Sequence, residues 1–230
     1  MIIWFSAALI FWLANVLLHL EFSNWIIAAY QTPFGKFVPR DHTRIIAFII
    51  WFLVCIFILI ECFKRKNRLS TIVAWVIAFT AMLLSMTYIT TTNVEMIHFL
   101  QYAILAYLLS LAFDRDRSIW PLLTLMFMTT GLGIIDELNQ YFFLTVNNSN
   151  YIDFNDFVLN QIGACGGLLA RYGFRNSPVE KPPLQKFQFI TAAAYCCVLI
   201  ITLALFLLGH LSYDTDTVIP PGGIDLIDDT

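Results

Sequence analysis

Charged residues are scarce in this chain. Asp, Glu, Lys and Arg together make up only 13% of its 230 residues, whereas a soluble domain carries about 25%. The apolar residues make up 59%, and the mean hydropathy is +0.75. This amount of charge is too small to solvate the surface of a chain of this length. The composition therefore excludes a protein whose main solvent is water.

Motifs of several common site types are also missing. The chain has five cysteines without C-x-x-C spacing: Cys55, Cys62, Cys165, Cys196 and Cys197. This pattern argues against a zinc site and a disulfide framework. A Gly-x-Gly pair at 131–133 lacks the third glycine of a dinucleotide-binding loop. No block of basic residues of the kind that binds nucleic acid is present. We therefore expect no cofactor and no nucleic-acid partner.

Long apolar runs dominate the sequence instead. Seven runs approach the roughly 20 residues that cross the hydrocarbon core of a bilayer, and they cover residues 2–20, 45–62, 70–90, 96–113, 118–135, 154–172 and 188–209. The runs are apolar on all sides, which favours helices over a transmembrane barrel. The sequence thus predicts an all-α fold, an integral membrane helical bundle with about seven transmembrane helices.

The basic residues fall mainly on one side of this expected bundle. Ten of the 13 Lys and Arg lie after the second, fourth and sixth runs, within 64–68, 115–117 and 171–186. The other three are Lys36, Arg40 and Arg44, in an opposite loop. Because short loops rich in Lys and Arg stay in the cytoplasm, we predict a cytoplasmic N-terminus and an extracytoplasmic C-terminus.

Four regions are expected along the chain. Residues 1–90 form an N-terminal region of three spans, with an interfacial helix at 21–35 on the outer side. Residues 91–175 form a core of three spans, and residues 176–211 hold the last span. The segment 212–230 carries five Asp and no Lys or Arg, so we expect an acidic, disordered tail.

Polar residues at membrane depth are costly and are treated as functional by default. They gather where the fourth run begins, where the fifth ends and where the sixth begins. The predicted topology puts all three places on the extracytoplasmic side. We predict a polar pocket there, with His19 and Glu21 nearby. The candidate ligand-binding residues are Glu95, His98, Tyr102, Glu137, Gln140, Asp153, Asp156 and Asn160.

Several of these polar residues and their neighbours also have a structural interpretation. Asn160 and Gln140 are equally well explained by hydrogen bonds between helices. Gly163 and Gly167 have small-x-x-x-small spacing, for which close helix packing is the preferred interpretation. Asp136 is expected at a solvated helix end.

The combination of Glu95, His98, Glu137 and Asp156 is harder to explain by structure alone. Three carboxylates near one imidazole must share protons, bind a cation or meet a cationic group of a ligand. Glu95-x-x-His98 has the form of one motif of the di-metal helical bundles, which need two such motifs and two further Glu. Because only one motif occurs, no metal is expected.

The sequence resembles the VanZ-like family of bacterial membrane proteins over about residues 94–172. The resemblance rests on three ordered segments: Glu95-Met96-Ile97-His98-Phe99-Leu100-Gln101-Tyr102, Asp136-Glu137-Leu138-Asn139-Gln140-Tyr141-Phe142, and Asp153-Phe154-Asn155-Asp156-Phe157-Val158-Leu159-Asn160-Gln161-Ile162-Gly163, with Gly167 following. The family often has an arginine six residues before Asp156, where this chain has Asn150. Lys36, Arg40 and Arg44 are the candidate substitutes for that arginine.

The resemblance implies a multi-pass protein of the bacterial cytoplasmic membrane with a link to susceptibility to the glycopeptide antibiotic teicoplanin, but no cofactor and no defined reaction. The favoured function is a non-catalytic envelope protein whose outer pocket binds a lipid-linked or amphiphilic cell-wall ligand, with membrane lipids as further partners. One alternative is an intramembrane enzyme that acts on such a lipid, with His98, Glu137 and Asp156 as catalytic candidates. The other is a proton-coupled transporter, for which the same carboxylates would form a relay. The oligomeric state is left open.

Overall fold

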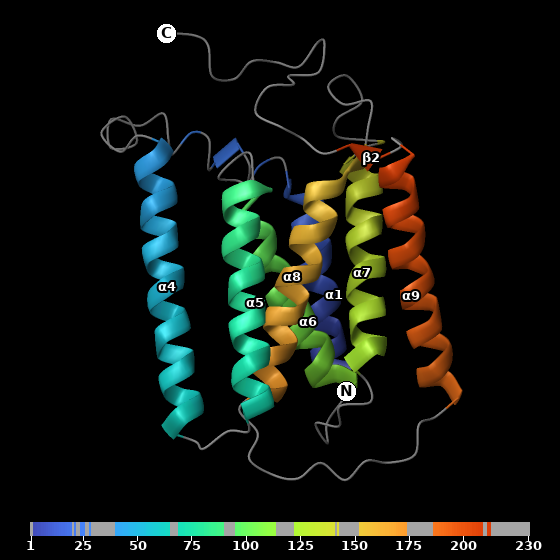
Figure 1. Ribbon diagram of the computed structural model, residues 1–230. Coiled ribbons are helices and arrows are strands. Elements are labelled where there is room, and N and C mark those ends of the chain that lie inside the picture. The colour runs from blue at the N-terminus through green and yellow to red at the C-terminus, as the bar shows by residue number, and fades with distance from the viewer. Residues whose placement is uncertain are drawn as a thin grey trace, which may run out of the picture.

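The chain forms a bundle of α-helices whose sequence neighbours run in opposite directions (Figure 1). The computed structural model describes residues 2–19, 21, 24, 25, 28, 40–64, 69–89, 95–113, 122–140, 142, 152–173, 186–208, 211 and 212. The described helices are α1 (Ile2–Leu17), α4 (Arg40–Lys64), α5 (Leu69–Tyr88), α6 (Ile97–Phe113), α7 (Leu122–Asn139), α8 (Phe154–Tyr172) and α9 (Lys186–Leu207). The all-α prediction is confirmed, and each of the seven predicted runs corresponds to one of these helices.

The strands in the described part of the chain are two residues long. Ile152–Asp153 (β1) pairs in parallel with Leu211–Ser212 (β2), directly before α8 and shortly after α9. This pair joins the two helices at one end of the bundle. The expected interfacial helix at 21–35 lies mostly outside the described residues, as does the expected acidic tail beyond Ser212.

The bounds of α7 differ from the hydropathy run that predicted it. The apolar run covers residues 118–135, whereas the helix spans Leu122–Asn139. It begins at Leu122, and Pro121 precedes it in the sequence; proline is tolerated at a helix start because the first N–H groups of a helix have no partner within it. It continues past Ile135 because backbone hydrogen bonding does not end where hydropathy falls. Asp136 and Glu137 therefore lie within the last turn of α7.

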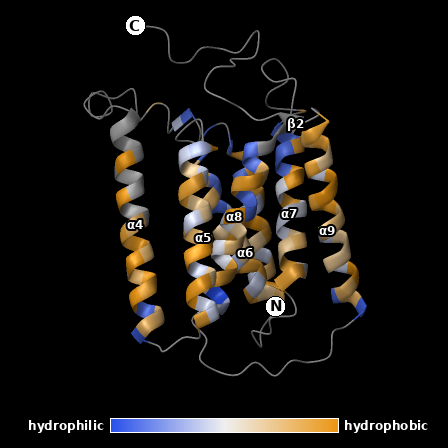
Figure 2. Ribbon diagram, viewed as in Figure 1, coloured by the Kyte–Doolittle hydropathy of each residue, from blue (hydrophilic) through white to orange (hydrophobic). Residues whose placement is uncertain are grey.

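Two of the described helices are long and apolar enough to cross a membrane. They are α5 and α9, with mean hydropathies of 2.0 and 2.5 over their most apolar windows. The helices α1 and α6 are also apolar but shorter, with 16 and 17 residues. Figure 2 shows hydrophobic residues over much of α4 and α9, and hydrophilic ones near the upper ends of α7 and α8.

The centre of the bundle is the packing of α6 against α8. A Cβ added at Gly163 would lie 2.6 Å from the carbonyl oxygen of Phe99, and one added at Gly167 would collide with the backbone of Ala103. The two helix backbones therefore touch along the Gly163 and Gly167 face. This is the close approach that small-x-x-x-small spacing favours, and it fixes how the polar ends of the two helices meet.

Two apolar clusters flank this contact. One joins α1, α6, α7, α8 and α9 around Leu105, Leu125 and Leu168. The other joins α4, α5, α6 and α8 around Trp75, Met86 and Leu159. Polar bonds also tie α1 to the centre, since the Trp12 indole donates to the Leu132 carbonyl oxygen at 3.1 Å. Together the two clusters join all seven described helices into one bundle.

Candidate functional site

Three helices bring an imidazole and two carboxylates together at one end of the bundle. His98 comes from the first turn of α6, Glu137 from the last turn of α7 and Asp156 from the first turn of α8. One ligand atom of each side chain lies within 4.8 Å of the other two. The three residues are only 2%, 6% and 8% exposed. The group thus forms a buried polar site, the His98–Glu137–Asp156 triad.

His98 is held at both ring nitrogens. Its Nδ1 lies 2.9 Å from Oδ1 of Asn160, and its Nε2 lies 3.6 Å from Oδ1 of Asp156. Asn160 follows Asp156 by four residues, so one face of α8 supplies both partners. An amide oxygen can only accept, so Nδ1 carries the hydrogen and donates it. Nε2 is consequently the nitrogen that faces Asp156.

A second polar contact lies beside the triad. The hydroxyl of Tyr102 donates to Oδ2 of Asp136 at 3.2 Å, and both residues are 3% exposed. The ring of Tyr102 also stacks on the His98 ring, with centroids 6.2 Å apart. The expectation that Asp136 is solvated at a helix end is therefore wrong, because α7 extends further than its hydropathy indicates and turns this carboxylate toward α6.

Other residues singled out in the sequence occupy different places. His19 lies near the site, with its ring centroid 6.2 Å from that of His98. Glu95 is half-buried, and its carbonyl oxygen accepts the backbone N–H of His98 at 3.0 Å. It belongs to no group of potential metal ligands among the described residues. Gln140 is half-buried just after α7. Asp153 lies in β1, and its side chain is outside the described part.

The basic residues considered as partners for this site, and Asn150, lie wholly or partly outside the described part of the chain. Lys36 and Asn150 lie outside the described residues, and Arg40 and Arg44 are described only in their backbone. Their proposed relation to an anionic ligand stays a prediction.

Sequence reasoning missed a polar connection through Gln161. Its Oε1 accepts from the Tyr195 hydroxyl at 2.8 Å and lies 3.0 Å from Oγ1 of Thr130. This connection joins α8 to α9 and α7. The signal in the sequence was a glutamine inside an apolar run, which interhelical hydrogen bonding explains.

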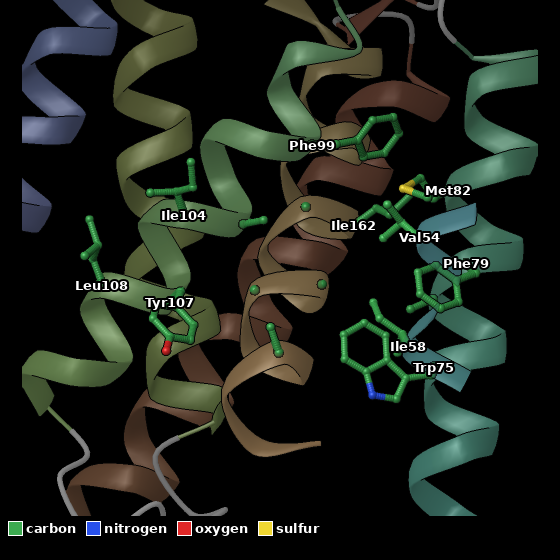
Figure 3. Close-up of a pocket in the computed structure, with 16 residues that line it drawn as sticks. Val54, Ile58, Trp75, Phe79, Met82, Phe99, Ile104, Tyr107, Leu108 and Ile162 are labelled. Carbon is green, nitrogen blue, oxygen red and sulfur yellow. The ribbon is translucent and has the colours of Figure 1, made fainter. Parts of the chain in front are cut away.

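An apolar cavity lies between α4, α5, α6 and α8 (Figure 3). Its volume is about 310 Å³, and its sixteen lining residues include no charged side chain. Two of them link it to the triad: Phe99 follows His98 directly, and Gly163 lies one turn after Asn160. The volume lies at the small end of the roughly 300–1,000 Å³ range of ligand pockets. The cavity and the triad are therefore adjacent along both central helices.

No family model, no curated protein and no solved structure matches the chain.

Proposed function

We propose that the chain is a multi-pass protein of the bacterial cytoplasmic membrane, VanZ-like in its three central motifs, which binds a lipid-linked or amphiphilic ligand of the cell envelope. The seven helices serve as spans, with the N-terminus in the cytoplasm and the triad on the extracytoplasmic side. The observation that carries the proposal is the adjacency of a buried polar triad and an uncharged cavity along α6 and α8. An amphiphile has the same division into a polar and an apolar part.

The outer helices support the membrane part of this proposal. The buried residues of α9 are Thr191, Tyr195 and Thr202, while large apolar side chains such as Ile200 and Leu207 are 67% and 73% exposed. A contiguous exposed apolar surface marks contact with a membrane or another protein. In lipid, polar groups between helices supply association where the hydrophobic effect does not. The arrangement of α9 fits a helix that faces lipid.

The length of α4 supports a further span. Its 25 residues include the apolar stretch from Ile45 to Ile60, and many of its apolar side chains are exposed, Phe57 by 64%. Two polar ends flank this stretch, with Arg40 at its start and Lys64 at its end. A helix of this composition matches the roughly 30 Å hydrocarbon core.

The polar part of the ligand would contact the triad. The triad consists of two carboxylates and one imidazole, so it favours a headgroup that is cationic or that is bound through a cation. The apolar part of the ligand would enter the cavity between α4, α5, α6 and α8. Teicoplanin susceptibility, which the family resemblance implies, is consistent with a ligand from the cell envelope.

Lipid retention by the purified full chain tests the proposal. Native mass spectrometry of the detergent-solubilised protein should show a specific lipid adduct. Gly166→Leu should remove the adduct, because a side chain at Gly166 meets no atom within 4 Å of its Cβ and would fill the cavity that Gly166 lines. Gly131→Leu is the matched control, since a Cβ at Gly131 also meets nothing within 4 Å and Gly131 does not line the cavity.

The proposed contact of the polar part of the ligand with the triad is tested in the same way. Glu137→Gln and Asp156→Asn nearly preserve shape while they remove charge, so they should reduce the adduct without lowering the yield of folded protein. Adducts of wild-type abundance in both Gly166→Leu and Asp156→Asn would rule out ligand binding at this place.

A further inference from the structure

The geometry of the triad fits a metal ion. Ligand atoms of His98, Glu137 and Asp156 lie within 4.8 Å of one another, and Nε2 of His98 is 3.6 Å from Oδ1 of Asp156. Two ligands bound tetrahedrally at about 2.0–2.1 Å from a zinc ion are roughly 3.4 Å apart. Small side-chain rotations would therefore close the three ligand atoms around one ion.

The second observation is the way in which His98 is oriented. Metal-bound histidines usually donate their other ring N–H to an oxygen acceptor, which fixes the ring and its tautomer. Asn160, itself only 2% exposed, provides this acceptor for Nδ1 at 2.9 Å. Nε2 then faces the carboxylate of Asp156 at 3.6 Å. The two ligand atoms lie on either side of a position that a metal ion could occupy.

The charge at this end of the bundle points in the same direction. Asp136, Glu137 and Asp156 are buried there. The Lys and Arg side chains in the described part of the chain are Lys64, Arg171 and Lys186, which belong to the opposite helix ends. Arg171 follows Asp156 by fifteen residues on α8, which is about 22 Å along the axis. A divalent cation bound by Glu137 and Asp156 would add positive charge next to these two buried carboxylates.

We infer that His98, Glu137 and Asp156 bind one first-row divalent cation, such as Zn²⁺ or Mn²⁺, with Asn160 orienting His98. One imidazole and two carboxylates suit these ions, whereas Mg²⁺ and Ca²⁺ favour oxygen ligands throughout. Three protein ligands leave a coordination position for water or for an oxygen atom of a ligand. The sequence argued against a metal because a second E-x-x-H was missing, but here each of three helices supplies one ligand.

Metal binding by the full-length protein in detergent tests this inference. After removal of metal with a chelator, titration with Zn²⁺ or Mn²⁺ alone should load about one equivalent and raise the melting temperature. His98→Asn, Glu137→Gln and Asp156→Asn should each lose this binding. Asn160→Ala should weaken binding by about 10–100-fold, as expected for a residue that orients a ligand. Glu95→Gln is the matched control, since it removes a carboxylate near His98 but outside the triad, and it should bind metal like the wild type.

Two measurements keep failure to fold separate from loss of binding. Thermal unfolding of each metal-free variant reports whether it is folded. X-ray absorption of the zinc-loaded protein should show nitrogen and oxygen ligands only. Sulfur ligands would place the metal at the cysteines and overturn the inference. It would also be overturned by wild-type protein that takes up no metal, which would leave His98 and Asp156 as an ion pair, or by folded Glu137→Gln and Asp156→Asn variants with wild-type affinity.

Discussion

The helices α6 and α9 are similar in composition but opposite in what they bury. Both are apolar, and α6 buries eight of its 17 residues, whereas α9 has 22 residues and buries Thr191, Tyr195 and Thr202. The helix α6 lies against α1, α7 and α8, while α9 lies at one side of the bundle (Figure 1). The contrast teaches that hydropathy alone does not determine which helix lies inside. The close approach of the α6 and α8 backbones at Gly163 and Gly167 distinguishes α6 from α9.

The largest expected effect is a break in the central packing. Gly167→Ala should destabilise the fold by about 3 kcal/mol or more, because its Cβ would collide with the backbone of Ala103 and a backbone cannot yield as a side chain can. Gly131→Ala is the control in a neighbouring helix with open space at its Cβ. It should be neutral or stabilising by up to about 1 kcal/mol. Unfolding in mixed detergent measures both, and equal stabilities would contradict the α6–α8 contact.

A charge on the outer face of α9 tests the other side of the comparison. If α9 faces lipid as proposed, Ile200→Arg should lower membrane insertion by about 2.5 kcal/mol, since a cation near the middle of a lipid-facing helix is costly. Ile200→Leu should insert like the wild type. On a water-exposed helix the same arginine would change stability by less than about 0.5 kcal/mol. The fraction of chain that resists carbonate extraction from membranes distinguishes the two results.

Removal of the hydroxyl beside the site should have an intermediate effect. Tyr102→Phe leaves Oδ2 of Asp136 without this donor in a buried place, at a cost of about 2 kcal/mol. Tyr107→Phe, on the same helix but 38% exposed, should cost much less. Melting temperatures of the two purified variants provide the comparison. A Tyr102→Phe variant as stable as Tyr107→Phe would show that the Tyr102 hydroxyl does not stabilise Asp136.

The smallest expected effect is at the contact of α9 with α8. Tyr195→Phe removes a 2.8 Å hydrogen bond to Gln161, and interhelical bonds of this kind contribute about 0.6 kcal/mol in membranes. Helix association should therefore weaken only slightly, with the fold retained. Complete loss of folded protein would mean that the packing of α9 depends on this single bond. The helix would then be more strongly coupled to the centre of the bundle than its exposed side chains indicate.

The sequence predicted an all-α fold, with one described helix for each apolar run, and the helix ends at which polar residues gather. Hydropathy runs were sufficient to predict the helices because an apolar stretch of about 20 residues can adopt few structures other than a helix. The same method misplaced the end of α7, since charges at Asp136 and Glu137 lower hydropathy without ending a helix. It therefore assigned Asp136 to solvent.

The partners within the site could not be predicted in the same way. Spacing placed Glu95 and His98 on one helix face, but which atoms meet depends on how α6, α7 and α8 are rotated relative to one another. Gly163 and Gly167 set that rotation for α6 and α8. The Asn160 contact with His98 and the absence of Glu95 from the triad both follow from this packing, which pattern alone does not encode.

Cross-linking between α7 and α8 tests the central claim, that separate polar helix ends form one site, most directly. In a variant with the five native cysteines replaced, Glu137→Cys and Asp156→Cys should be joined in high yield by a short bifunctional thiol reagent in native membranes, as measured by peptide mass spectrometry. Leu125→Cys with Asp156→Cys is the control pair, since Leu125 lies twelve residues earlier on α7, about 18 Å away along its axis. The account predicts cross-linking of the first pair only. Equal yields for both pairs, or none for the first in folded protein, would contradict it.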